Sequence, residues 1–131
     1  MIIRDELNRE MDFACDELID MLEKIKHHRE QEMDDLKQKI RRYEEKKRAE
    51  ETFYRSLSPV RKFFASRPPN HHQAVEYMVH VKDRLKQING IKNRIRQIDG
   101  VIASCRDHSS EELEVSSAMT EEILKYRKGQ V

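Results

Sequence analysis

The stretch RLKQINGIKNRIRQIDGVIA, residues 84–103, contains two similar eight-residue segments, RLKQINGI and RIRQIDGV, whose starts are ten residues apart. Each segment includes a pair, Asn89-Gly90 or Asp99-Gly100, of the kind that forms tight β-hairpin turns. The apolar residues around the glycines nevertheless recur every three or four positions, which is the period of an α-helix. No part of the stretch shows the two-residue alternation of strands that flank a turn. It therefore predicts a continuous amphipathic helix, in which each glycine costs about 1 kcal/mol relative to alanine.

The same helical period extends in both directions from this stretch. Pro68-Pro69 sets the N-terminal limit, because the residue before a proline is disfavoured in the α region, and Asn70 can serve as an N-cap. We expect the helix to cover about residues 71–105. Its apolar side is formed by Val75, Met78, Val81, Leu85, Ile88, Ile91, Ile95, Ile98, Ile102 and Cys105.

The first half of the chain predicts a second long helix, over about residues 3–57. Its polar stretch 26–32 leaves a break in the helix open. Ser58-Pro59 ends it, and a tip over residues 58–69 can hold a short helix of its own. The apolar positions that recur at steps of three or four are Ile3, Leu7, Met11, Ala14, Leu18, Met21 or Leu22, and Ile25, followed by Met33, Leu36, Ile40 and Tyr43.

A short third helix is expected over about residues 110–128, opened by a capping box of Ser109 and Glu112. The predicted fold class is thus all-α: a single elongated domain, residues 1–131, made of a long antiparallel, coiled-coil-like helical hairpin and a C-terminal helix. A fold-back near residue 63 or 64 places residue i opposite 127 − i. Cys15 then lies about 10 Å along the helix from Cys105, so no intrachain disulfide is expected.

Composition excludes several classes of function. Of 131 residues, 39% are charged and only three are glycine, so neither a Walker-type loop nor a GxGxxG fingerprint can be built. There is no GxSxG motif, and no apolar run approaches the roughly 20 residues that cross a bilayer. The N-terminus lacks a secretory pattern. We expect a non-enzymatic cytoplasmic protein without a cofactor, without membrane contact and without a small-molecule substrate.

Charge is unevenly distributed along the chain. Residues 1–52 carry 12 basic and 16 acidic residues, residues 53–106 carry 11 and 3, and residues 107–131 carry 3 and 6. The basic helix can pair with acids of the first helix, such as Glu32, Asp34 and Asp35. Alternatively it binds nucleic-acid phosphates. The candidate nucleic-acid residues are Arg84, Lys86, Lys92, Arg94 and Arg96.

The predicted tip combines aromatic and basic side chains, and no acidic residue lies between Glu51 and Glu76. Aromatic residues beside arginine are common at protein interfaces and at single-stranded nucleic-acid sites. The aromatic residues can equally close the end of the helical bundle. The candidate partner-binding residues are Phe53, Tyr54, Arg61, Lys62, Phe63, Phe64 and Arg67.

One metal-like pattern occurs, because His72, Glu76 and His80 fall on one helical face at intervals of four residues. Metal sites in helical bundles use inward-facing Glu and His, but the usual ExxH spacing is missing. We therefore predict no metal site and keep these three residues as weak candidates.

These observations predict an interaction or adaptor protein that acts through protein–protein contacts, as a homodimer or as part of a larger assembly. In outline, a long helical hairpin with a thin apolar side resembles stalk proteins of secretion apparatus and coiled-coil adaptors. The alternative is a small nucleic-acid-binding helical protein that uses the basic helix and the tip.

Overall fold

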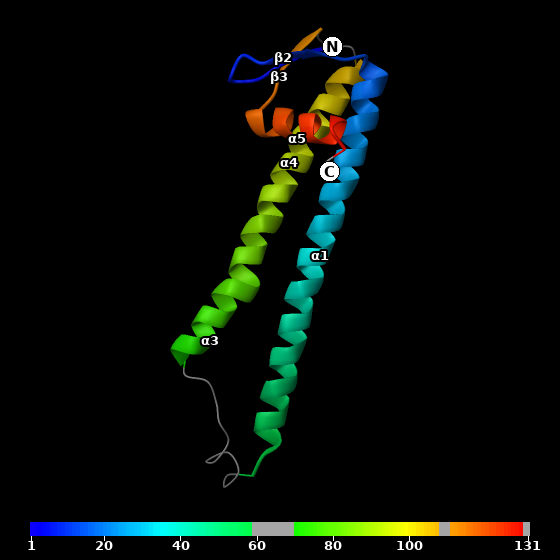
Figure 1. The fold of residues 1–131 in the computed structure, drawn as a ribbon. Helices are drawn as coiled ribbons and strands as arrows, with labels where there is room; N and C mark the ends of the chain where they lie inside the picture. Colours follow the sequence, from blue (N-terminus) through cyan, green and yellow to red (C-terminus); the bar gives the residue numbers. More distant parts are fainter. Residues whose placement is uncertain (59–69, 108–110, 130–131) are drawn as a thin grey trace. The chain divides into compact units, whose positions relative to one another are not determined.

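The structure, a computed structural model, describes residues 1–58, 70–107 and 111–129, without the side chains of residues 70–73. This part of the chain is mostly helical and contains a small three-stranded mixed sheet (Figure 1). It divides into two compact units, which are unit 1 (Met1–Glu32 with Gly90–Val131) and unit 2 (Met33–Asn89). The predicted predominance of helix is confirmed, but the all-α class omits the sheet.

The sheet belongs to unit 1 and has the strand order β2-β1-β3. Strand β1 (Ile2–Arg4) pairs antiparallel with β2 (Glu10–Asp12) and parallel with β3 (Glu112–Glu114). Ile3 on the central strand lies opposite Met11 and Leu113, and its side chain is fully buried. The sheet therefore joins the beginning of the chain to a segment more than 100 residues later.

The predicted helix over residues 3–14 is wrong, and a turn after β1 explains why. The buried Asp5 carboxylate accepts the backbone N–H groups of Leu7 and Arg9, both at 3.0 Å, and Asn8 adopts a left-handed φ of 60°. Such side-chain bonds offer the backbone an alternative to helical pairing. Burial opposes the charge on Asp5, but the hydrogen bonds from Arg9 and Leu7 outweigh it and hold the Asp5 pKa below its usual value.

Helix α1 begins at Cys15 and ends at Ser56 (Cys15–Ser56). It continues through residues 26–32, so the break that the sequence leaves open does not occur. Asp16 and Glu17 occupy its first turn, where negative charge complements the helix dipole. The buried side chains of α1 all lie in unit 1: Leu18, Met21, Leu22 and Ile25.

The C-terminal helix α5 (Ser117–Arg127) begins later than predicted. Its N-cap is Ser116, whose hydroxyl accepts the Met119 N–H at 3.2 Å, whereas Glu112 of the expected capping box lies in β3 and Ser109 lies outside the described residues. The helix packs into the core of unit 1. That core consists of Ile3, Phe13, Leu18, Met21, Leu22, Ile25, Ile98, Val101, Ile102, Cys105, Met119 and Ile123.

The second long helical segment runs without interruption through α3 (Asn70–Tyr77), the π-helical turn η1 (Met78–Lys82) and α4 (Asp83–Asp107). Gly90 and Gly100 lie inside α4, which confirms the helical interpretation of the two similar segments. The predicted apolar side is only partly buried. Val81 and Ile88 are buried, but Val75, Met78 and Leu85 are 44–47% exposed.

The two helical glycines are not required by close packing. A Cβ atom added at Gly90 or Gly100 meets no atom within 4 Å. We therefore expect Gly90→Ala and Gly100→Ala each to raise the free energy of unfolding by about 1 kcal/mol. Urea titration measures the change, and a loss of stability in either variant would show that its glycine permits a bend or a close approach.

A buried carboxylate links three helices of unit 1. Glu122 of α5 is 6% exposed, pairs with Arg94 of α4, and lies 3.5 Å from the Nε atom of Arg29 in α1. Arg29 also donates to Glu32 at 2.6 Å. Since a buried carboxylate is costly without cationic partners, the two arginines allow α5 to sit at this position.

Replacing this carboxylate tests its contribution to stability. We expect Glu122→Gln to lower the free energy of unfolding by about 2 kcal/mol, because the charge-assisted hydrogen bond from Arg94 and the ion pair with Arg29 are lost. The adjacent Glu121 is half-exposed and pairs with Arg9 at 2.7 Å, so Glu121→Gln is the matched control, with a loss of at most about 1 kcal/mol. Equal losses in the two variants, measured by urea unfolding, would contradict this role for Glu122.

The two cysteines lie closer together than the sequence predicts. Cys15 starts α1, and its thiol neighbours the buried thiol of Cys105, although no disulfide joins them. Burial, followed by the neighbouring Cys15 thiol, raises the pKa of Cys105 above its usual value. The predicted register, in which residue i faces 127 − i, does not hold for this pair.

This proximity predicts an intrachain disulfide under oxidising conditions. Exchange with oxidised glutathione at alkaline pH should join Cys15 to Cys105, with the two protein thiols giving two hydrogens to the glutathione disulfide. The crosslink should raise the free energy of unfolding by up to about 4 kcal/mol, because it closes a long loop and so lowers the entropy of the unfolded chain. Peptide mapping after thiol alkylation detects it, and two cysteines that stay fully alkylatable would refute the prediction.

Candidate functional site

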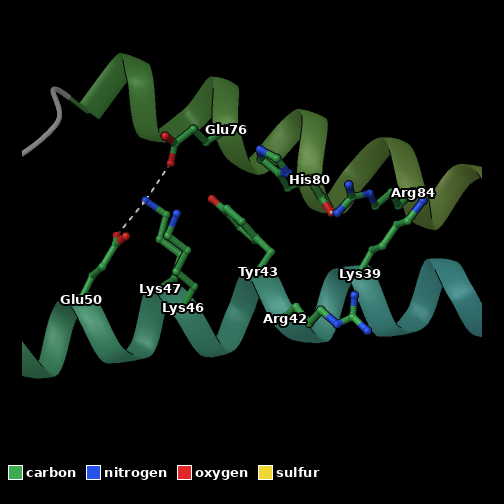
Figure 2. Close-up of a pocket in the computed structure, with 9 residues that line it drawn as sticks. All are labelled: Lys39, Arg42, Tyr43, Lys46, Lys47, Glu50, Glu76, His80 and Arg84. Atoms are coloured by element: carbon green, nitrogen blue, oxygen red, sulfur yellow. Dashed lines mark hydrogen bonds and ion pairs between the residues drawn. The ribbon is translucent and has the colours of Figure 1, made fainter.

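A groove in unit 2, with a volume of about 440 Å³, is lined mainly by basic side chains (Figure 2). In Figure 2, Lys39, Tyr43, Lys46 and Lys47 extend from α1 toward the helical segment that carries His80 and Arg84. We call this site the basic groove. It is lined by Lys39, Arg42, Tyr43, Lys46, Lys47, Glu50, Glu76, His80 and Arg84.

The centre of the basic groove is a pair of stacked rings. Tyr43 of α1 and His80 of η1 have ring centroids 4.7 Å apart and planes within 12° of each other. On one side of the rings, the Lys47 ammonium lies 2.8 Å from Glu76 and 3.8 Å from Glu50. The hydrogen bond to Glu76 raises the Lys47 pKa above its usual value, so this lysine stays charged and paired.

The other cations of the groove lack such partners. Lys39, Arg42, Lys46 and Arg84 form no ion pair with any residue in the described part of the chain. Arg84 donates only to the backbone oxygen of His80, at 3.4 Å. With five basic and two acidic side chains, the lining carries a net charge of +3 when His80 is neutral. The basic groove is therefore suited to attract an anion.

A larger cavity in unit 1, about 730 Å³, differs from the basic groove in that its charged side chains are mostly paired. It lies beside the sheet, the start of α5 and Gly100 of α4. Its charged side chains are largely satisfied within the protein: Arg4 pairs with Glu10 and Glu112, and Glu6 accepts hydrogen bonds from Ser117. These bonds from Ser117 hold the Glu6 pKa below its usual value. The cavity offers less unpaired charge than the basic groove does.

The predicted partner-binding tip is only partly described. Phe53, near the end of α1, is 67% exposed, and Tyr54 is half-buried. The remaining candidates lie outside the described residues: Arg61, Lys62, Phe63, Phe64 and Arg67.

The predicted nucleic-acid residues do not come together as one set. Arg84 lines the basic groove, whereas Arg94 is bound to Glu122. The expected pairing of the basic helix with Glu32 is wrong, because Glu32 pairs with Arg29 and His28 of its own helix. The other three candidates are exposed: Lys86, Lys92 and Arg96.

The weak metal candidates have other roles. Glu76 is paired with Lys47, His80 stacks on Tyr43, and the His72 side chain lies outside the described residues. Across residues 1–58, 70–107 and 111–129, no three His, Cys, Asp or Glu side chains converge as metal ligands.

Sequence reasoning missed the α1 side of the basic groove. Lys39 and Lys46 lie three or four residues from both Arg42 and Tyr43, so their shared helical face can be read from the sequence. The sequence does not show which residues of the second segment face them.

No family model, curated protein or solved structure matches the chain. None of the helices in the described part of the chain is both long enough and apolar enough to cross a membrane.

Proposed function

We propose that this protein is a non-enzymatic interaction protein that forms a homodimer through the helices of unit 2. The observation that carries the proposal is a set of exposed apolar side chains on one continuous helical segment, here called the apolar stripe. Its members are 44–52% exposed: Val75, Met78, Val79 and Leu85.

The composition of unit 2 supports the need for a second surface. Among its described residues only Val81 and Ile88 are buried apolar side chains. A body with so small a core gains little hydrophobic stabilisation by itself. Covering each half-exposed side chain of the apolar stripe would contribute about 1 kcal/mol.

A second copy is the occupant that we favour. The stripe is uncharged and includes methionine, which adapts to irregular apolar surfaces. A two-fold axis brings identical patches together, so one chain supplies both halves of the interface. Residues 33–89 contain 14 Lys and Arg and 8 Asp and Glu, a net charge of +6. Two such units repel each other, and the apolar contact must exceed that repulsion.

We further propose that α1 and the α3–η1–α4 segment form a long antiparallel hairpin. In unit 1, Glu23 pairs with Arg106 and Lys26 with Asp99. In unit 2, likewise, a later residue of α1 contacts an earlier residue of the second segment: Tyr43 stacks on His80, and Lys47 pairs with Glu76. The order of partners in each unit supports the hairpin. Nucleic-acid binding by α4 stays a prediction.

Light scattering tests the homodimer. We expect a mass of twice the 15.8-kDa chain that falls on dilution, with association strengthened by salt because salt screens the repulsion between two positive units. Val79→Lys should weaken association by about tenfold or more, or about 1.4 kcal/mol. Gln87→Lys adds the same charge at an exposed position off the stripe and should have a smaller effect.

Two results would contradict the proposal. One is a monomer at all concentrations and salt strengths. The other is equal behaviour of the Val79→Lys and Gln87→Lys variants, which would remove the apolar stripe from any interface. Circular dichroism of both variants verifies that each is folded.

A further inference from the structure

We propose that the basic groove binds a short oligophosphate, either free or as the phosphate chain of a nucleotide. This inference is independent of the homodimer, because it rests on the charged face of unit 2 and not on the apolar stripe.

The first support is the arrangement of unpaired cations along the groove. Lys39 and Lys46 are seven residues apart on α1, about 10 Å along the helix axis. Arg84 lies across from Lys39 and presents its guanidinium from the second helical segment (Figure 2). The groove therefore offers positive charge at two separated points, which suits an elongated anion with charges at both ends better than a single small ion.

The second support is the chemistry of these groups. A guanidinium can donate two parallel hydrogen bonds to one phosphate group, and lysine supplies a mobile point charge. The volume of about 440 Å³ lies in the range of small-molecule sites. A doubly charged phosphate gains more from several unpaired cations than a single carboxylate does.

The stacked rings favour a compact oligophosphate over a single-stranded nucleic acid. Single-strand sites use free aromatic faces on which successive bases stack. Here Tyr43 and His80 turn one face each toward the other, at a centroid distance of 4.7 Å. Recognition in the groove therefore depends mainly on charge.

The location on a π-helical turn is a further reason to expect a binding site. His80 lies within η1, which is closed by a hydrogen bond from the Asp83 N–H to the Met78 carbonyl oxygen. Such turns are rare inside α-helices and are frequent at functional sites.

Calorimetric titration of the full chain with inorganic tripolyphosphate tests the proposal. We expect one site per chain and an affinity that falls as salt rises. Lys39→Gln combined with Lys46→Gln should weaken binding at least tenfold. The matched control is Lys37→Gln combined with Arg41→Gln, which removes the same charge from exposed positions of α1 outside the groove and should change affinity by less than threefold.

Further titrations distinguish the source of the phosphate. ATP binding as tightly as tripolyphosphate would indicate recognition of the phosphate chain alone, and tighter ATP binding would show that the rings also contact the nucleoside. Shifts of the His80 ring resonances in NMR spectra should accompany binding in either case.

Three outcomes would overturn the proposal. They are no binding of tripolyphosphate at low salt, equal weakening by the groove variant and the control variant, and tighter binding of a single-stranded oligonucleotide than of tripolyphosphate. Thermal melting of both double variants ensures that a loss of binding is not a loss of fold.

Discussion

The buried side chain of Ile3 connects the parts of unit 1. It projects from the central strand of the sheet into the same core as Leu18 and Leu22 of α1, Ile98 of α4 and Ile123 of α5. Because β1 pairs with β3 on one side and β2 on the other, elements from both ends of the sequence reach this core. A chain with 39% charged residues has few apolar side chains to bury, and most of its buried ones are used here.

Because most buried apolar side chains lie in unit 1, unit 2 has a very small hydrophobic core. Its helices carry many long, charged side chains, a type whose aliphatic part can cover apolar surface while the charged end stays in water. Tyr43 and His80 contact each other where a larger core would place aliphatic residues. The surface of unit 2 thus carries two features that could bind a partner: the apolar stripe on one helical segment and the unpaired cations of the basic groove.

Helical periodicity predicts α1 from residue 15 onward and all of α4, because long amphipathic segments leave a strong pattern. The same pattern misleads at residues 3–14, where Ile3, Leu7 and Met11 match a helix by spacing alone. The hydrogen bonds of the Asp5 carboxylate decide this segment, and the pairing of β1 with β3 depends on residues more than 100 positions away. The proximity of Cys15 and Cys105 is missed because the register assumed from the sequence, 127 − i, places Cys15 opposite residue 112.

The basic groove, too, could be predicted from the sequence only in part. The face of α1 that lines the basic groove follows from spacing. Glu76, His80 and Arg84 also share a four-residue spacing, but spacing alone does not show that their face meets α1. A π-turn acts like one residue inserted into an α-helix, and it shifts the angular phase of everything before it.

This shift in angular phase makes the groove sensitive to insertions and deletions in η1. Glu76, His80 and Arg84 reach the groove from positions before, within and after η1. Removing one residue within 78–82 would restore a regular α-helix and rotate α3 by about 100° relative to α4. Glu76 would then move away from Lys47. The lining of the groove therefore depends on the length of this segment as well as on its side chains.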